Sequence, residues 1–210
     1  MPKVSPVQRE RRRQAILVAA EDVFLGRGYQ LATVDDIAGR SGLSVGALYR
    51  YFPTKSDLML SLLEERLGRT PDLLRRLTDG AGPAWERLAR CVDIFASALK
   101  VRHPSTGRLL LVAWGEALQD RSVREGLHRR YAGLVDYLVE VIDEGQRAGE
   151  FSGTADARTL SALLLCLADG ATLYWSTGTS ELDLPRLREM TLGMLDLYLR
   201  PGSNRQTVSR

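Results

Sequence analysis

The side chains with the clearest chemistry lie within one short stretch, and they are the hydroxyl, phenol, guanidinium and ammonium groups of Thr33, Ser44, Tyr49, Arg50, Tyr51 and Lys55. Groups of these types donate hydrogen bonds to phosphate oxygens and to base edges. The whole chain of 210 residues has two histidines and two cysteines, and it contains neither an HExxH motif nor a paired-cysteine motif. Because no nucleophile, base or metal site is organised, we expect no catalytic residue, no metal and no cofactor.

The charge distribution favours a polyanionic partner for the N-terminal end. Residues 1–55 contain nine Lys/Arg and five Asp/Glu, a net charge of +4, whereas the remaining residues contain twenty basic and twenty-one acidic side chains. All of the excess positive charge therefore lies in the first quarter of the chain.

The elements that must position these groups are two short helices. Thr33 is expected to cap a helix over 34–40, with Asp36 completing a capping box, and Ser44 to cap a second helix over 45–52. The tight turn at Gly42 between them is typical of a DNA-binding helix-turn-helix. If Leu48 and Phe52 pack inward, the outward positions of the second helix are Val45, Gly46, Ala47, Tyr49, Arg50 and Tyr51.

Apolar spacing of three and four residues predicts helices throughout the chain and no strand. The expected helices cover about 8–25, 34–40, 45–52, 55–77, 84–101, 106–118, 120–149, 157–176 and 185–200. The two cysteines, Cys91 and Cys166, are expected to be buried, reduced thiols. The most apolar stretch, 160–175, is too short to span a bilayer and contains Asp169, so we expect no membrane partner and a cytoplasmic protein.

The segments Ala32–Ala38 and Ser41–Leu58, which include the run Leu-Tyr-Arg-Tyr-Phe-Pro-Thr-Lys-Ser-Asp-Leu, resemble the N-terminal domain of TetR-family repressors. The resemblance implies an all-α fold: a three-helix helix-turn-helix DNA-binding domain over 8–67, with the helix-turn-helix at 33–52, and a larger helical ligand-binding and dimerisation domain over 68–200. Residues 201–210 are expected to form a disordered tail. The C-terminal part is more faintly similar to the betaine-operon repressor branch.

The resemblance also implies roles for individual residues. Thr33 and Lys55 would hold phosphates, and Ser44, Val45, Gly46 and Ala47 would face base edges or the groove wall. The family commonly has Ser or Thr where Ala47 stands, so a hydroxyl contact is lost there. Tyr49 and Tyr51 would contact phosphates or thymine methyl groups, and Arg50 would read a base.

Three alternatives stay open for these side chains. Arg50 could pair with Asp22, and Tyr49 could be partly structural. Arg11, Arg12 and Arg13 could form a solvated helix face or contact DNA phosphates.

The last two predicted helices carry more apolar surface than one chain can bury, and in the resembling family the corresponding helices form a four-helix dimer interface. The candidates for this interface are Leu164, Leu167, Ala168, Ala171, Trp175, Met190, Met194 and Tyr198. Burial under a neighbouring loop of the same chain is the alternative.

The region that encloses the effector in the resembling family offers Phe95, Leu99, Leu110, Trp114, Leu118, Tyr131 and Val135 as candidate effector contacts, although each could be ordinary core. The resemblance thus implies a homodimeric repressor that a small-molecule effector releases from a palindromic double-stranded DNA operator. Helix 55–77 is expected to relay the change as the only connection between the domains. The alternative is a DNA-binding regulator that a protein partner controls, or that responds to no ligand.

Overall fold

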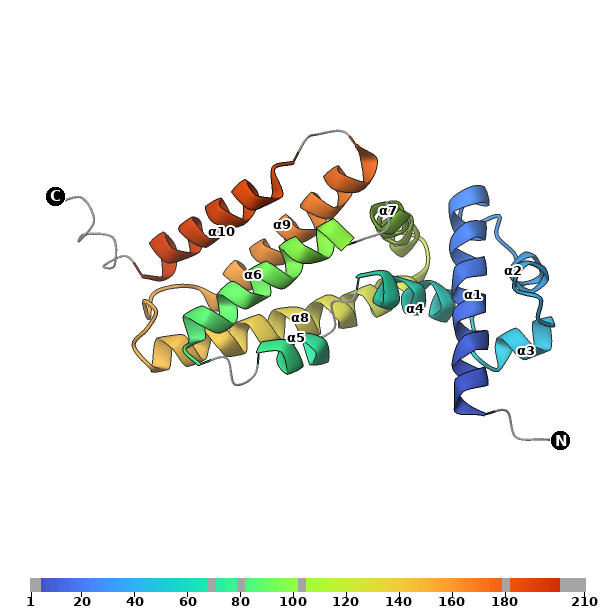
Figure 1. The fold of residues 1–210 in the computed structure, drawn as a ribbon, viewed down its shortest axis with the longest axis horizontal. Coiled ribbons are helices and arrows are strands. Elements are labelled where there is room, and N and C mark those ends of the chain that lie inside the picture. Colours follow the sequence, from blue (N-terminus) through green and yellow to red (C-terminus); the bar gives the residue numbers. More distant parts are fainter. Residues whose placement is uncertain (1–4, 68–70, 79–81, 102–104, 179–181, 201–210) are drawn as a thin grey trace. The chain divides into compact units, whose positions relative to one another are not determined.

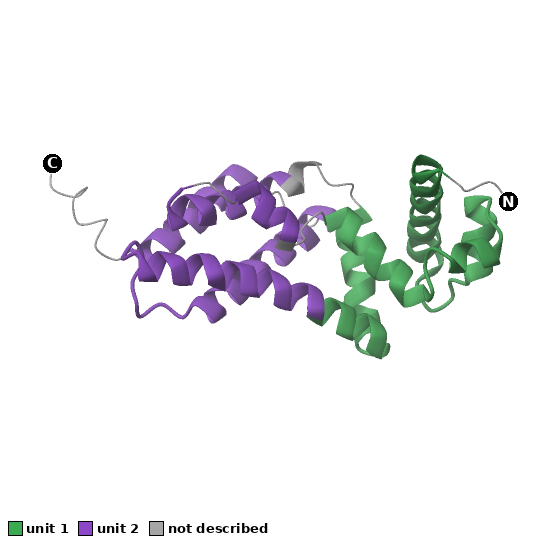
Figure 2. Ribbon diagram, turned by 90° about the horizontal axis from the view of Figure 1, so that it is seen from below, with its two compact units in different colours: residues 1–67, 103–128 green, residues 68–102, 129–210 purple. Residues whose placement is uncertain are grey.

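The computed structural model describes residues 5–67, 71–78, 82–101, 105–178 and 182–200, and within these ranges every regular element is an α-helix. The chain divides into two compact units, which are coloured separately in Figure 2. Unit 1 comprises residues 1–67 and 103–128, and unit 2 comprises residues 68–102 and 129–210.

Unit 1 contains the helix-turn-helix and four further helical segments. Its helices are α1 (Pro6–Arg27), α2 (Val34–Ser41), α3 (Val45–Tyr49), α4 (Lys55–Leu67), α7 (Ser105–Ala117) and the first turns of α8 (Arg121–Arg147). Figure 1 shows α2 and α3 together along one side of α1. Residues 103–128, which the predicted division assigned to the second domain, here belong to the same unit as the helix-turn-helix.

The ends of the unit 1 helices follow from local chemistry. Ser5 accepts a hydrogen bond from the amide of Gln8 at the start of α1, and Pro6 occupies the first turn, where no amide is needed. Gly28 ends α1 with φ = +78°, and Gly42 ends α2 with φ = +70°. Both are left-handed conformations that a side chain would disfavour, so the chain reverses at these glycines.

The core of unit 1 joins helices that are distant in sequence. Ile16 and Phe24 of α1, Leu62 of α4 and Leu109 of α7 are all fully buried. At Gly126 in α8, an added Cβ would lie 2.1 Å from a Leu60 methyl group of α4, so this glycine permits a close approach of the two helices. Unit 1 is therefore held by α7 and α8 as well as by the helices next to one another in sequence.

Unit 2 is a second helical layer with its own core. Its helices are α5 (Pro71–Thr78), α6 (Ala84–Val101), the rest of α8, α9 (Ala157–Thr177) and α10 (Leu184–Leu199). Leu88 of α6, Tyr137 and Val141 of α8, and Leu195 of α10 belong to one buried cluster. Asp156 and Asp183 cap α9 and α10, since each carboxylate accepts a hydrogen bond from the backbone amide three residues further on.

The structure corrects two expected helices and one expected connection. The helix expected over 55–77 is two helices. Pro71 has no amide hydrogen to donate, and its ring would clash with a carbonyl of the preceding helical turn. The helix expected over 45–52 ends at Tyr49, and the chain continues to Phe52 as a turn. The chain passes between the units after residues 67, 102 and 128, so α4 is not the only connection.

The cysteine prediction is correct for one residue and wrong for the other. Cys91 is buried, whereas Cys166 on α9 is exposed. Among the described residues, α9 is the one helix that is both long enough and apolar enough to cross a membrane. Part of its apolar surface is buried within unit 2. Its exposed apolar face is described below.

Candidate nucleic-acid interface

The helix-turn-helix is fixed by hydrogen bonds at each of its ends. Thr33 Oγ1 accepts from the Asp36 amide at 3.1 Å, and Ser44 Oγ accepts from the Ala47 amide at 3.3 Å. In the turn, the Leu43 amide donates to the Ala38 carbonyl at 3.1 Å. Leu48 and Phe52 are buried, so the five-residue α3, which is too short to be stable alone, is held by packing.

This packing leaves one side of α3 exposed. Ser44, Gly46, Tyr49 and Arg50 are exposed, while Val45 and Tyr51 are half-buried. Ala47, expected to face the groove, is 9% exposed and is part of the buried side. The exposed side therefore combines a hydroxyl, a phenol and a guanidinium with a glycine that permits a close backbone approach.

Arg50 lies at the C-terminal end of α3 and is exposed. The alternative pairing with Asp22 does not form, because the Asp22 carboxylate is bound to Arg40 at 2.7 Å. The Arg50 guanidinium thus has the exposure that a base-reading side chain needs.

Thr33 has a structural role in addition to the expected phosphate contact. Its hydroxyl donates to the Asp36 carboxylate at 2.7 Å, and its own amide donates to the same carboxylate at 3.1 Å. These hydrogen bonds, with a smaller effect of Arg27, hold the pKa of Asp36 below its ordinary value. Because the hydroxyl hydrogen is already donated, the first-turn amides of α2 are the better phosphate donors at this helix end.

Lys55 is also engaged within the protein. Its ammonium donates to the carbonyl oxygens of Tyr29 at 2.8 Å and Ala32 at 3.1 Å, and it lies 4.3 Å from the centre of the Tyr29 ring. An ammonium has three donors, so one remains for a phosphate. The sequence gives no signal of this arrangement, because the partners are backbone carbonyls more than twenty residues away.

The arginines at the start of α1 differ from one another. Arg13 donates to Glu65 of α4 at 3.2 Å and lies 5.9 Å from the Phe52 ring, which fixes it beside the end of the helix-turn-helix. Arg11 and Arg12 are exposed. The structure therefore separates one structural arginine from two that are available to a phosphate.

Two features bear on catalysis and metals. Residues Gly42 to Gly46 spell the letters of a GxSxG nucleophile motif, yet they join two helices, whereas that motif needs a strand followed by a helix. The Ser44 hydroxyl caps α3 by accepting a hydrogen bond from the Ala47 amide. Within the described residues, no group of three or more His, Cys, Asp or Glu side chains could hold a metal ion.

The residues expected to contact an effector are divided between the two units. Leu110, Trp114 and Leu118 belong to unit 1, where Leu110 is fully buried and the other two are exposed. In unit 2, Phe95 belongs to the buried core cluster, and Tyr131 and Val135 are partly buried against it. Tyr131 donates a hydrogen bond to Asp169. The side chain of Leu99 lies outside the described residues.

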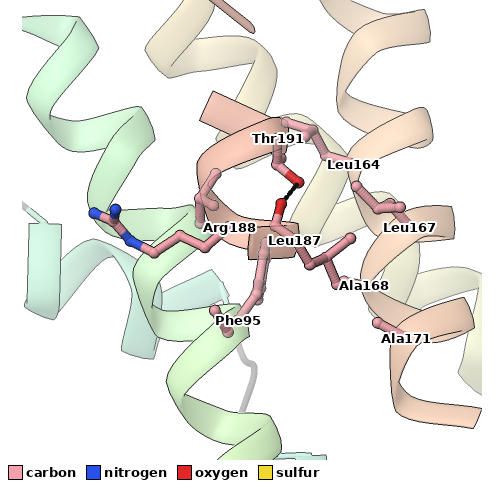
Figure 3. Close-up of a pocket in the computed structure, with 10 residues that line it drawn as sticks. Phe95, Leu164, Leu167, Ala168, Ala171, Leu187, Arg188 and Thr191 are labelled. Atoms are coloured by element: carbon pink, nitrogen blue, oxygen red, sulfur yellow. Dashed lines mark hydrogen bonds between the residues drawn. The ribbon is translucent and has the colours of Figure 1, made fainter. Parts of the chain in front are cut away.

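Phe95 is the one of these candidates that lines a described hollow. The hollow is a small apolar space of about 40 Å³ between α6, α9 and α10, and Figure 3 shows Phe95 facing Leu164, Ala168 and Leu187 across it. Thr191 donates its hydroxyl to the Leu187 carbonyl at 2.7 Å, so its polar group is satisfied at the edge of this space. A space of this volume holds no more than one or two groups of about the size of a water molecule.

The predicted dimer residues are better grouped. A larger apolar groove of about 450 Å³ runs between α9 and α10, and its lining includes Leu164, Leu167, Met190, Met194 and Tyr198. Of the other candidates, Trp175 is exposed, Ala168 is half-buried, and Ala171 is buried within the protomer beside Leu184. The sequence reasoning missed Leu163, which is 55% exposed and lines the same groove.

A buried charge in unit 1 was also missed. The carboxylate of Glu21 on α1 is 6% exposed and accepts hydrogen bonds from Arg66 of α4 and Ser105 of α7. A buried carboxylate is stable only with such partners, so these three residues fix three helices to one another. Partners separated by 45 and 84 residues leave no local pattern in a sequence.

Comparison with known proteins agrees with both parts of this description. A family model described as bacterial regulatory proteins, tetR family, matches residues 16–62, and a model described as BetI-type transcriptional repressor, C-terminal, matches residues 84–200. The fatty acid metabolism regulator protein of Bacillus subtilis is 26% identical over 181 residues, covering 86% of this chain and 91% of that protein.

Two solved structures share the fold. A transcriptional regulator FadR from Bacillus subtilis in complex with stearoyl-CoA has a TM-score of 0.67 and 24% identity, covering 87% of this chain and 96% of that one. A transcriptional regulator from Saccharomonospora viridis in complex with choline has a TM-score of 0.69 and 23% identity, covering 90% and 98%. With a helix-turn-helix in unit 1 and family models matching both parts, this chain belongs to the tetR family of bacterial regulatory proteins, with a BetI-type C-terminal part, and is a DNA-binding transcriptional regulator.

Proposed function

We propose that this regulator is a homodimeric repressor that binds a palindromic operator and leaves it when a small molecule binds. The observation that carries the proposal is the exposed side of α3, where Ser44, Gly46, Tyr49 and Arg50 are presented by a helix that packing holds in place. A single five-residue helix reads too few base pairs for specificity in a genome, so a second copy is required.

The second copy would join through the groove between α9 and α10. Leu163, Met190, Met194 and Tyr198 are each at least half exposed there, and an exposed apolar surface of this kind marks an interaction site. In the symmetric dimer, these residues would meet their own counterparts. A repressor that binds a chromosomal operator would act in the cytoplasm.

Release from DNA would be a shift between two states of the dimer. The effector would bind more tightly to a state in which the two α3 helices no longer match successive major grooves, about 34 Å apart. The structural relatives described above hold ligands as different as stearoyl-CoA and choline. The proposal therefore names a small molecule without specifying its chemistry.

The experiment is an in vitro selection of genomic fragments by the full-length protein, followed by anisotropy titrations on the selected site. We expect inverted repeats with half-sites centred about one helical turn apart, bound by a dimer in sedimentation. A panel of metabolites is then screened for a rise in melting temperature and for loss of operator binding. Selected sites without inverted symmetry would contradict the dimeric mode, and a ligand that stabilises the protein without lowering operator affinity would contradict release.

A further inference from the structure

The loop that leads into the helix-turn-helix, residues 28–32, is held by side chains from two other parts of unit 1. Lys55, in the first turn of α4, binds two of its carbonyl oxygens, as described above. Gln30 of the loop donates to the carboxylate of Glu116, near the end of α7. Glu116 is 9% exposed, so a nearly buried carboxylate receives this hydrogen bond. The loop is thus attached both to α4 and to α7.

A second attachment runs through three hydroxyl and carboxyl groups. Ser56 Oγ donates to Asp120 Oδ2 at 2.9 Å, and the Tyr29 hydroxyl lies 3.2 Å from Ser56 Oγ. Because Ser56 has a single hydroxyl hydrogen, which Asp120 receives, Tyr29 is the donor in the second bond. Tyr29 and Ser56 are both buried, so this chain of donors leads from the loop to the carboxylate without competition from water.

Asp120 has a second task at the corner between α7 and α8. Its other oxygen accepts the amides of Ser122 at 2.7 Å and Val123 at 3.1 Å, which caps α8. Burial alone would raise its pKa, but the hydrogen bonds from Val123, Ser56 and Ser122 hold the pKa of Asp120 below its ordinary value. Burial and the nearby acidic groups raise the pKa of Tyr29, so its donor proton is retained.

We propose that Glu116 and Asp120 are positioning residues that fix the helix-turn-helix on the α7–α8 corner, and that they thereby set the half-site spacing which the dimer accepts. The proposal rests on the proposed function, since it needs two reading helices on one operator. α8 runs without interruption from unit 1 into unit 2, which carries α9 and α10. α8 therefore joins the unit that carries the proposed dimer groove to the corner on which hydrogen bonds hold the loop before the helix-turn-helix.

The physical reason is preorganisation. Hydrogen bonds to carboxylates are stronger than those between neutral groups. The bonds to Glu116 and Asp120 would therefore restrict rotation of the helix-turn-helix about α4. A dimer whose helix-turn-helix units are held in this way binds only operators whose half-site spacing matches that of its two α3 helices. A dimer in which they are released also accommodates operators with other spacings and binds its own operator less tightly.

The test measures spacing selectivity of the full-length dimer by fluorescence anisotropy. The selectivity is the ratio of the Kd for an operator with one base pair added between the half-sites to the Kd for the selected operator. One base pair displaces the half-sites by about 3.4 Å and by about one-tenth of a helical turn. For Gln30→Glu, which places two carboxylates together, and for Ser56→Ala, we expect this ratio to fall about tenfold, equivalent to ~1.4 kcal/mol.

Two further variants make the test specific. Gln30→Glu combined with Glu116→Gln exchanges donor and acceptor, re-forms the hydrogen bond, and should restore the ratio. Ser61→Ala is the matched control, since it makes the same change on α4 at a half-buried position five residues further along the chain than Ser56. Melting temperatures of all variants report the fold separately.

The outcomes are distinct. Folded variants whose two Kd values rise by the same factor, with an unchanged ratio, would show a merely structural role and overturn the proposal. Failure of the exchanged pair to restore the ratio would overturn the role of Glu116. A wild-type protein with no preference for an inverted repeat would instead overturn the proposed function on which the inference rests.

Discussion

The exposed side of α3 in unit 1 and the exposed face of α9 and α10 in unit 2 are open to solvent for opposite reasons. On α3, a hydroxyl, a phenol and a guanidinium protrude from a helix whose other side is buried. On α9 and α10, methionine, leucine and tyrosine side chains remain hydrated although unit 2 has a complete core of its own. The chemistry of the first surface suits a polyanion and that of the second an apolar partner, so the two units present surfaces of different kinds.

The largest effect is expected from a charge placed on the apolar face of α9 and α10. Met194 is 59% exposed, so Met194→Asp should leave the protomer folded and place a carboxylate in the groove of each subunit. We expect monomers in sedimentation and a loss of operator affinity of about a hundredfold or more, because the two half-sites would no longer be bound as one unit.

The control for this variant is Leu77→Asp on α5, which charges another exposed apolar position of unit 2. It should remain dimeric with unchanged operator affinity. Ala171 is unsuitable for the test, because it is buried within its own protomer and a charge there would disturb the fold. A Met194→Asp protein that is still dimeric would contradict the assignment of the groove to the dimer.

The next effect concerns the polar surface. Arg50→Ala should weaken operator binding by about 1–3 kcal/mol and relax the base preference at one position of each half-site. Arg40→Ala is the matched control, since Arg40 is an exposed arginine of the same helix-turn-helix that is already paired with Asp22. Equal losses on all DNA sequences would make Arg50 a phosphate contact.

The two cysteines differ in burial and should therefore differ in reactivity. Burial raises the pKa of the Cys91 thiol to about 12, so at pH 8 almost no reactive thiolate exists there and Cys91 should not react in the folded protein. Cys166 is exposed on α9, near Leu163 and Leu167 of the apolar face. With a disulfide reagent at pH 8, we expect slow reaction of Cys166 in the dimer and faster reaction in Met194→Asp. Equal rates would place Cys166 outside the interface.

The smallest expected effect distinguishes the arginines of α1. If Arg12 binds a phosphate, Arg12→Ala should reduce the slope of log Kd against log salt concentration by about one. Arg13→Ala should change that slope less, because Arg13 is bound to Glu10 and Glu65. Titrations at four salt concentrations measure both slopes, and a wild-type slope for Arg12→Ala would contradict the phosphate contact of Arg12.

Local chemistry explains what could be predicted from the sequence. Thr33, Ser44 and Asp156 are helix caps in the structure as their spacing predicts, and Gly42 makes the expected turn. These features depend on side chains and amides within three residues of each other, so a sequence shows them directly.

The misses depend on contacts between distant residues. Nothing near Lys55 in sequence indicates that its ammonium binds the carbonyls of Tyr29 and Ala32, and nothing near Glu21 indicates Ser105. The break before Pro71 is the exception, because a proline within a helical pattern is a local signal, which the continued apolar spacing through Leu67 and Leu74 obscured. The position of α7 in unit 1 follows from packing over more than forty residues, which periodicity cannot report.

The discontinuity of unit 1 has a consequence for recombination. Its two segments, residues 1–67 and 103–128, are interrupted in the chain by α5 and α6. A chimaera that takes only the first 67 residues from a relative would combine Tyr29, Gln30 and Ser56 equivalents of one parent with Glu116 and Asp120 of the other. Exchange of operator specificity between members of the family, in the laboratory or during gene shuffling, should therefore succeed more often when both segments are transferred together.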